Sequence, residues 1–396
     1  MDRCAFAAEA ITDDAKMRIL HILNRSFGCR DARDIVTLRT CDALAALGHE
    51  VILLTGRGKL DYQAVHGVSS NARLRIIQLP VMDFRLAGIR VCSNLVFFAA
   101  AASALRRLTN YGESVIYTRE RHLVHMLIRR KRRRGARIVY DAHEVHSIFG
   151  PPEKSAENRR IEAAVLNSAD AITAGSRALA EKIRDTYGAH LNIDVIPFAA
   201  PSVPDQMPLR SSMDGIFRVF YMGQLSKDRG TDDLIAAIKL VPGCEAHLLG
   251  GDADSALAFR GQAAETGVTG RVFFYGFVDP VEIPRVVSKA DAFVIPPKAV
   301  GRMPYSAHTK VYDCLAGGRP IIASDLPSIR EVLTHEVNAL LVEPGSCESI
   351  AAAIMRLRSD PGLAERLGAR AFEDARVYTY ENRAAKLQEV FERVLA

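Results

Sequence analysis

Lys310 and Asp313 are the two residues whose types and spacing say most about chemistry. They follow an apolar strand pattern at Ala292–Ile295 and a polar loop, and they open a short helix expected over Thr309–Ala316. Residues three apart share one face of a helix, and open α/β sheets bind ligands in loops at the carboxyl ends of strands. A cation and a carboxylate at a helix N-terminus suit a ligand with both phosphate and hydroxyl groups. We therefore expect a nucleotide-sugar to bind here.

A second candidate site is the turn at residues 223–230, which directly follows an apolar strand pattern at 218–222. Gly223 at the end of a strand lets backbone approach a phosphate, and the next helix presents its N-terminus. Arg229 can bind a diphosphate with two parallel hydrogen bonds. The alternative interpretation is a surface turn with solvated charges.

Strand and helix patterns alternate along the whole chain, which predicts parallel sheets with helical crossovers. Prolines and a loss of periodicity over residues 201–215 predict a linker. We expect an α/β protein with two doubly wound, Rossmann-like domains, at residues 17–200 and 216–379.

The composition is typical of a globular chain in a reducing compartment. Of 396 residues 48% are hydrophobic and 25% charged, which is enough for two separate cores. The seven cysteines never form a Cys-x-x-Cys pair, which argues against a disulfide frame or a structural zinc site. The apolar stretch at 91–105 is shorter than the roughly 20 residues of a membrane span and predicts an amphipathic or buried helix. Residues 1–16 lack the apolar core of a signal peptide, and we expect a disordered extension or an incorrectly assigned start there.

The residues around Lys310 also resemble a known family. The order Ser306…Lys310-x-x-Asp313-x-x-Ala316-Gly317-Gly318-x-Pro320, followed by an apolar strand and Ser324, resembles the donor-site signature of family-4 retaining glycosyltransferases (glycosyl transferases group 1). The resemblance implies the GT-B fold, in which two Rossmann-like domains face each other across a cleft. It also implies that the last helix, 380–396, crosses back to the first domain.

The resemblance gives several of these residues a role in donor binding. It implies that Arg229 and Lys310 bind the donor diphosphate and that Asp313 accepts hydrogen bonds from the ribose. Gly223 and Gln224 would belong to the phosphate loop, where Gln224 stands in place of the family's Arg and Arg229 in place of its Lys.

Three further positions depart from the family pattern. In the first loop Gly28 remains of a Gly-Gly pair, and Cys29 fills the other position. Tyr305 stands where many relatives have a second carboxylate that holds the sugar. Asp313 is one methylene shorter than the usual Glu, which changes its reach toward the ribose.

Two other segments resemble parts of the family's site. Residues 140–144, Tyr-Asp-Ala-His-Glu, resemble an Asp-x-His-Glu motif that faces the donor sugar from the first domain. His143 would hydrogen-bond the sugar or orient the acceptor, and a neutral histidine suits proton handling. The alternative is a buried histidine that is merely paired. Phe277 and Val278 follow another strand pattern, and their backbone would pair with the nucleobase edge.

Two charged motifs have competing interpretations. Asp252 and Asp254 imitate the Asp-x-Asp metal motif of another glycosyltransferase fold, but two carboxylates alone make a poor Mg²⁺ site, so we favour a solvated loop and expect no metal. The run from Arg129 to Arg134 can dock on anionic lipid headgroups at about 1 kcal/mol per residue. The alternatives for this run are a solvated helix end and nucleic-acid contact; the latter is disfavoured because interleaved aromatics are missing.

Together with the resemblance, these observations predict a hexosyltransferase that needs no metal or other cofactor, and the resemblance implies a retaining course. Its donor would be a nucleoside-diphosphate sugar, and its acceptor a hydroxyl, with a lipid-linked sugar as one option. The expected setting is bacterial cell-envelope polysaccharide or glycoconjugate synthesis, in the cytoplasm or peripherally on the inner face of the cell membrane. Two alternatives stay open: a nucleotide-sugar epimerase on the same fold, and a catalytically silent GT-B partner protein, which the departures from pattern favour.

Overall fold

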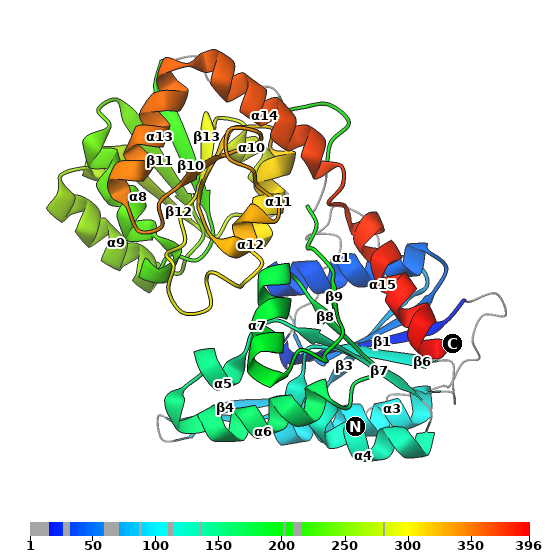
Figure 1. The fold of residues 1–396 in the computed structure, drawn as a ribbon. Coiled ribbons are helices and arrows are strands. Elements are labelled where there is room, and N and C mark those ends of the chain that lie inside the picture. The colour runs from blue at the N-terminus through cyan, green and yellow to red at the C-terminus, as the bar shows by residue number, and fades with distance from the viewer. Residues whose placement is uncertain are drawn as a thin grey trace. The chain divides into compact units, whose positions relative to one another are not determined.

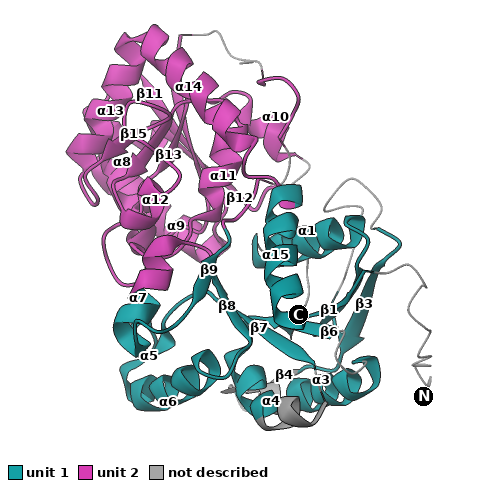
Figure 2. Ribbon diagram, turned by 45° about the vertical axis from the view of Figure 1, so that its right-hand side comes forward, with its two compact units in different colours: residues 1–174, 182–196, 381–396 teal, residues 175–181, 197–380 magenta. Residues whose placement is uncertain are grey.

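The computed structural model describes residues 16–26, 32–58, 71–86, 89–109, 114–134, 136–200, 203–208, 215–279 and 282–396. The chain forms two compact units, coloured separately in Figure 2. Unit 1 consists of Met1–Ala174, Lys182–Ile196 and Glu381–Ala396, and unit 2 of Gly175–Glu181 and Pro197–Tyr380.

Unit 1 is built on a seven-stranded parallel sheet with the order β3-β2-β1-β6-β7-β8-β9. Its strands are β1 (Arg18–Ser26), β2 (Glu50–Gly56), β3 (Leu74–Leu79), β6 (Ser114–Thr118), β7 (Arg137–Ala142), β8 (Ala171–Ala174) and β9 (Ile193–Val195). Its helices are α1 (Ala32–Ala46), α3 (Asn94–Leu108), α4 (Arg121–Arg134), α5 (His146–Phe149), the 3-10 turn η1 (Pro152–Lys154), α6 (Ser155–Leu166) and α15 (Tyr380–Leu395), while α7 (Arg177–Tyr187) contributes to both units. Figure 1 shows α1 and α15 on one face of this sheet and α3, α4 and α6 on the other. Because helices cover both faces, strands such as β2 and β6 are mainly apolar and are buried along nearly their whole length.

The last helix, α15, belongs to the core of unit 1. Ala384, Leu387, Val390 and Phe391 pack with apolar residues of α1 and of the central strands. Arg383 is buried on the same helix and donates a hydrogen bond of 2.9 Å to the carbonyl of Ile196 at the end of β9. Helix α15 therefore packs against the sheet of unit 1.

Unit 2 is built on a six-stranded parallel sheet with the order β12-β11-β10-β13-β14-β15. Its strands are β10 (Phe217–Met222), β11 (Cys244–Leu249), β12 (Val272–Gly276), β13 (Ala292–Ile295), β14 (Ile321–Ser324) and β15 (Leu340–Val342). Its helices are η2 (Lys227–Arg229), α8 (Thr231–Leu240), α9 (Ala253–Thr266), η3 (Thr269–Arg271), α10 (Ile283–Val287), α11 (Thr309–Ala316), α12 (Pro327–Arg330), α13 (Cys347–Ser359) and α14 (Pro361–Ala375). One continuous apolar core joins the sheet to α8, α9, α13 and α14.

These sheets confirm the predicted α/β class with two doubly wound, Rossmann-like domains. The strand order of both units, third-second-first-fourth and onward, is that of nucleotide-binding Rossmann sheets. The predicted helix at Thr309–Ala316 is confirmed, and it ends where Gly317 and Gly318 were expected to stop it, with Gly318 in the left-handed region (φ +63°).

The prediction for residues 91–105 was partly wrong. Residues 91–93 belong to β5 (Ile89–Ser93), which pairs antiparallel with β4 (Met82–Leu86), and helix α3 begins only at Asn94. A short apolar run with β-branched residues is compatible with a strand or a helix. Here pairing with β4 makes residues 91–93 part of a strand. Among the described residues, no helix combines the length and apolar character that crossing a bilayer requires.

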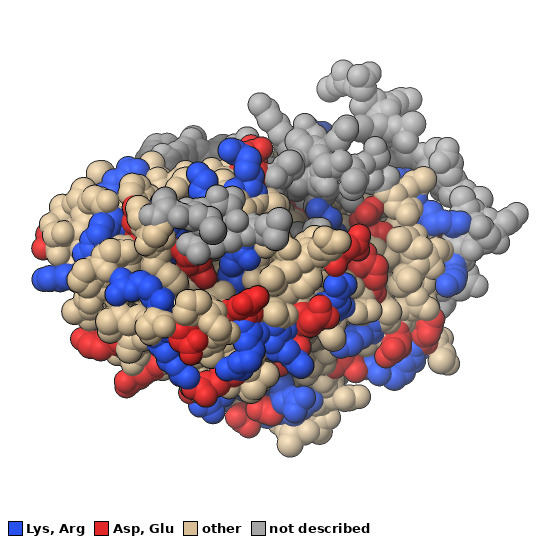
Figure 3. Space-filling model, turned by 90° about the horizontal axis from the view of Figure 1, so that it is seen from above, with Lys and Arg blue, Asp and Glu red and all other residues tan. Residues whose placement is uncertain are grey.

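Lys and Arg side chains are interspersed with Asp and Glu on the face shown in Figure 3. The formal net charge of +6 is thus not gathered into one uniform field on that face.

Candidate functional site

The strand order of unit 2 locates its candidate ligand site. Chain connections leave β10 and β13 toward opposite sides of the sheet, because β10 is followed by β11 on one side and β13 by β14 on the other. In doubly wound sheets ligands bind outside the carboxyl ends of the strands at this switch point. The loop after β10 carries Gly223, Gln224 and Arg229, and the loop after β13 leads to α11 with Lys310 and Asp313.

These two loops touch each other. Gly230 lies in the left-handed region (φ +69°), and a Cβ on it would come within 1.8 Å of the carbonyl oxygen of Pro296, so only glycine fits this approach. The backbone N–H of Lys298 donates to the carbonyl of Asp228 at 2.9 Å. The two loops that carry the predicted residues are therefore in contact at the end of the sheet.

Gly223 and Gln224 form the first step of the loop after β10. The N–H of Gly223 continues the sheet ladder to the carbonyl of Leu249 at 2.9 Å. The carbonyl of Gln224 accepts a hydrogen bond of 2.5 Å from the hydroxyl of Tyr221, whose pKa burial raises to about 12. The Gln224 side chain is exposed, so it is accessible to a ligand, although it lacks the charge of the family's Arg.

Arg229 is half-buried at the end of η2 and lies near the start of α11. Its charge, after burial, helps to lower the pKa of His308 to about 4, whereas the bond from His308 Nε2 to the Met303 carbonyl at 3.0 Å opposes that shift. His308, directly before α11, is therefore neutral at pH 7 and adds no charge beside Arg229. Sequence reasoning missed His308, since its only signal was its place one residue before the helix.

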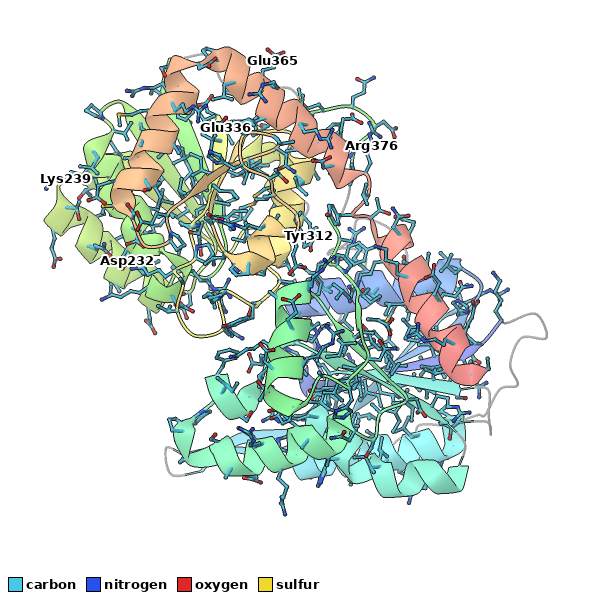
Figure 4. All side chains as sticks on the ribbon, viewed as in Figure 1. Asp232, Lys239, Tyr312, Glu336, Glu365 and Arg376 are labelled. Atoms are coloured by element: carbon cyan, nitrogen blue, oxygen red, sulfur yellow. The ribbon has the colours of Figure 1, made fainter. Side chains whose placement is uncertain are left out.

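Lys310 and Asp313 lie on one face of α11, as their spacing predicted, and they form an ion pair that was not predicted. Nζ of Lys310 lies 2.7 Å from an Asp313 carboxylate oxygen, and the two side chains are 29% and 16% exposed. Burial would lower the pKa of Lys310, but the effect of Asp313 is larger and raises the pKa. Lys310 is therefore protonated at neutral pH. In Figure 4 the label on Tyr312 marks this helix. The pair therefore places a hydrogen-bond donor for phosphate, Lys310, beside a hydrogen-bond acceptor for hydroxyl groups, Asp313.

The helix that follows the first loop, α8, begins with two acidic residues. Asp232, labelled in Figure 4, and Asp233 lie in its first turn. Lys298 binds both carboxylates, at 2.8 Å and 3.2 Å. This cation comes from the loop after β13, so it offsets the acidic charge close to the predicted anion site and links the two loops a second time.

Phe277 and Val278 follow β12, the edge strand two positions from β10. Phe277 is 46% exposed, and the adjacent Gly276 carbonyl accepts a hydrogen bond of 2.6 Å from Gly250. All three strands are parallel, so these residues lie at the same end of the sheet as Gly223, one strand beyond β11. Their backbone pairing with a nucleobase stays a prediction.

Asp252 has a local structural role. Its side chain accepts from the N–H of Ser255 at 2.8 Å, and the Ser255 hydroxyl in turn accepts from the N–H of Asp252, which makes a capping box for α9. Within the described part of the chain, no three His, Cys, Asp or Glu side chains come together as a metal site would need.

His143 lies in unit 1, in the loop directly after β7. Its Nε2 is 2.7 Å from Asp141, whose other carboxylate oxygen accepts a bond of 2.9 Å from Thr173. Burial and Arg119 lower the pKa of His143, while Asp141 raises it, and the net shift is downward. The imidazole is thus neutral at pH 7. Gly28 and Cys29 lie outside the described residues.

The surroundings of His143 were missed by sequence reasoning. Arg119 follows β6, Arg383 comes from α15, and His21 lies in the middle of β1. Burial lowers the pKa of His21 to about 3, so this histidine is also neutral. Neither of its ring nitrogens has a hydrogen-bond partner among the described residues. No sequence period links these positions, because they meet only through the sheet and the returning helix.

Two family models match the chain. Residues 34–199 match a glycosyl transferase 4-like domain, and residues 212–374 match glycosyl transferases group 1. Among curated proteins, the chain is 34% identical over 206 residues to the lipopolysaccharide core biosynthesis glycosyltransferase LpsD of Rhizobium meliloti. That alignment covers 50% of this chain and 56% of LpsD, so the chain spans about half the length of this relative.

Solved structures match over nearly the whole chain. Sucrose-phosphate synthase from Thermosynechococcus elongatus has a TM-score of 0.78 at 20% identity, covering 96% of this chain and 99% of its own. HepE of Anabaena, in complex with UDP and glucose, has a TM-score of 0.73 at 16% identity with the same coverage. These likenesses show the GT-B fold.

Proposed function

Since this chain belongs to the glycosyl transferases group 1 and has the GT-B fold, we propose that it transfers a sugar from a nucleoside-diphosphate sugar to a hydroxyl acceptor. The observation that carries the proposal is the switch point of unit 2, where touching loops present Arg229 and the Lys310–Asp313 pair. HepE, a structural neighbour, binds UDP and glucose, which supports a nucleotide-sugar donor here. LpsD, a relative, acts in lipopolysaccharide core biosynthesis, which supports a bacterial cell-envelope product.

The reaction separates a sugar from a diphosphate, so the site must stabilise the charge that develops on the leaving group. Arg229 and Lys310 supply two fixed cations, and such preorganised groups stabilise a transition state without reorganisation. Asp313 would accept hydrogen bonds from the ribose once the phosphate binds Lys310. With both cations available, the proposal needs no metal ion.

The stereochemical course is proposed as retention. We assign no carboxylate as nucleophile, since Asp313 would bind the ribose and Asp141 is held by His143 and Thr173. The acceptor hydroxyl would then attack the face that the leaving group vacates. A hexose is the proposed sugar, and neutral His143 would accept a hydrogen bond from a sugar or acceptor hydroxyl.

The acceptor is proposed to be a lipid-linked sugar at the cytoplasmic face of the membrane. The run from Arg129 to Arg134 forms the end of α4, and such basic runs bind anionic headgroups. Binding to vesicles of phosphatidylglycerol but not phosphatidylcholine, lost when these arginines are replaced by Gln, would support the contact. Equal binding to both lipids, or none, contradicts it.

A thermal-shift panel of UDP, GDP, ADP and dTDP, each with and without EDTA, tests the donor. A ligand that binds only the native state raises the unfolding midpoint. We expect one nucleotide to raise it, with EDTA making no difference, and the matching nucleotide-sugar to give a product with the anomeric configuration of the donor. Absence of any shift would favour a catalytically silent partner protein, and conversion of the donor without acceptor would indicate an epimerase.

A further inference from the structure

Asp141 is bound at both carboxylate oxygens. One oxygen accepts from the hydroxyl of Thr173 on the neighbouring strand β8 at 2.9 Å, and the other lies 2.7 Å from Nε2 of His143. The Asp141 side chain is only 6% exposed, whereas the His143 side chain is 26% exposed. The carboxylate is therefore fixed within the sheet, and the imidazole that it holds remains accessible.

The proton positions follow from the charges that face this pair. Burial alone would raise the pKa of Asp141, but His143, Arg119 and Arg383 outweigh burial and lower it, so Asp141 is a carboxylate at pH 7. An ionised carboxylate only accepts hydrogen bonds. Nε2 of His143 must therefore carry the proton of the bond between them.

The same neighbours keep the imidazole neutral. Burial lowers the pKa of His143 first, then Arg119 after β6 and Arg383 on α15 lower it further, while Asp141 on β7 opposes them. His21 on β1 is neutral too, because burial lowers its pKa to about 3. A neutral imidazole with its proton on Nε2 has an acceptor at Nδ1.

We propose that Asp141 is a positioning residue, which holds His143 as the neutral Nε2–H tautomer so that Nδ1 accepts a hydrogen bond from a substrate hydroxyl. This rests on the proposed transferase function only for the identity of the hydroxyl. The partner that orients a histidine commonly fixes both its tautomer and its ring position. The competing role for Asp141 is purely structural, a hydrogen bond that joins β7 to β8.

Asp141→Asn separates the two roles. If the Thr173 hydroxyl still donates its hydrogen bond, the amide oxygen of the new Asn must accept it. The NH₂ group of this Asn then faces Nε2 of His143, which must accept a hydrogen bond. The proton moves to Nδ1, and the acceptor becomes a donor. Asp141→Glu keeps a carboxylate and serves as the conservative variant.

A matched control lies at the other end of the same strand. Asp170 accepts a hydrogen bond of 2.6 Å from the backbone N–H of Ile138, near the start of β7, and pairs with Arg137. Asp170→Asn therefore also weakens a carboxylate contact between β7 and the loop before β8. It changes stability without touching His143.

The decisive measurement is the ¹³Cδ2 resonance of His143 in histidine-labelled protein, assigned by its loss in His143→Gln. We expect the Nε2–H tautomer in the native protein, in Asp141→Glu and in Asp170→Asn, and the Nδ1–H tautomer in Asp141→Asn. A native Nδ1–H tautomer, or an unchanged tautomer in folded Asp141→Asn, would overturn the proposal. This readout needs no substrate, so it stands even if no transferase activity is found.

Kinetics provide the second readout. Asp141→Asn should lower kcat by about ten-fold or more, in line with other partners that orient a functional histidine, and Asp141→Glu should recover part of the loss. The acidic limb of the pH–rate profile should move to lower pH in Asp141→Asn, because the carboxylate is the group that raises the pKa of His143. A limb that moves equally in Asp170→Asn would favour the structural role and overturn the proposal.

Discussion

The two candidate sites are built in opposite ways. In unit 2 the Lys310–Asp313 pair joins residues three apart on one helix, and both side chains keep part of their surface exposed. In unit 1 Asp141 and Arg383 are almost fully buried, and Arg383 reaches Thr40, a partner 343 residues away in sequence. The exposed pair can exchange its partner for a ligand at little cost in folding. The buried cluster is held by packing, so a change there affects stability and function together.

The largest expected effect tests the exposed side of this comparison. Lys310→Ala and Arg229→Ala should each lower kcat by about 10²–10³, the range found when one preorganised donor is removed from an oxyanion site. Stability should change by no more than about 1 kcal/mol, because the ion pair of Lys310 is partly exposed and such pairs contribute little, and Arg229 is only half-buried. Steady-state kinetics beside thermal unfolding measure both quantities.

Lys239→Ala is the matched control for Lys310→Ala. Lys239 is an exposed lysine in the last turn of α8, away from both loops, and is labelled in Figure 4. Its replacement should leave kcat unchanged. A Lys310→Ala protein as active as Lys239→Ala would remove Lys310 from the site.

The features that depend on residues close together in the sequence could be predicted. The bounds of α11 follow from an apolar strand, a helical spacing and the Gly317-Gly318 stop, all within a short stretch. The helix period alone sets Lys310 and Asp313 on one face. The alternation of strands and helices likewise predicted both parallel sheets, since βαβ units place consecutive strands in a limited number of ways.

The contacts between residues far apart in the sequence could not be predicted. No spacing in the sequence links Asp141 to Thr173 or Arg383, because the sheet order and the returning α15 bring them together. Lys298 gave no motif either, although it ties two loops through Asp232. The β4–β5 hairpin was missed because the apolar pattern continues from β5 into α3, and only the pairing with β4 shows that β5 ends at Ser93. Contacts of this kind depend on tertiary packing, which overrides local preference.

Arg383→Ala sharpens the comparison from the buried side. Arg383 is 5% exposed and binds the carbonyl of Ile196 and the hydroxyl of Thr40. Removing it should lower the free energy of unfolding by about 3 kcal/mol, since buried acceptors lose a charged donor and Asp141 loses a countercharge. Denaturant unfolding measures the loss.

Arg393→Ala provides the control on the same helix. Arg393 pairs with Asp194 but is 52% exposed. Its loss should cost less than about 1 kcal/mol, as for other exposed pairs. Equal costs for Arg383→Ala and Arg393→Ala would mean that α15 is not anchored through its buried arginine.

Acidification should act on both units, through neutral histidines that include His21 in unit 1 and His308 in unit 2. Burial lowers the pKa of His21 to about 3 and that of His308 to about 4, below the ordinary value of 6.5. The unfolded chain then binds more protons than the folded one between these values and pH 6.5, so stability rises with pH across this window. Each histidine should cost about 2 kcal/mol between pH 7 and pH 5.

His21→Phe and His308→Gln assign these two contributions. Each variant should flatten the dependence of the unfolding free energy on pH between 5 and 7, and His21→Phe should be more stable than the native protein at pH 5. The edge contact of His21 with Tyr117, at 4.8 Å between ring centres, gives the phenyl ring a place to pack. An unchanged slope in either variant would show that the replaced histidine is charged in the folded protein.

The smallest expected effect concerns Lys298, which is intermediate between the two kinds of site. It is 24% exposed, yet it binds Asp232 and Asp233 at once and comes from the opposite loop. Lys298→Met should cost about 1 kcal/mol at pH 7 and weaken nucleotide binding, because two uncompensated carboxylates then face the anion site. Burial and Asp232 raise the pKa of Asp233, so the loss of stability should shrink as the pH falls and this carboxylate takes up a proton.

Adding Asp232→Asn to Lys298→Met should restore part of the nucleotide affinity, a coupling that a double-mutant cycle by calorimetry can measure. Arg285→Met, which removes an 80% exposed partner of Glu282, should change neither quantity. Additive effects of Lys298→Met and Asp232→Asn would mean that the lysine acts on the loop by packing alone, as the buried residues of unit 1 do, and not by charge.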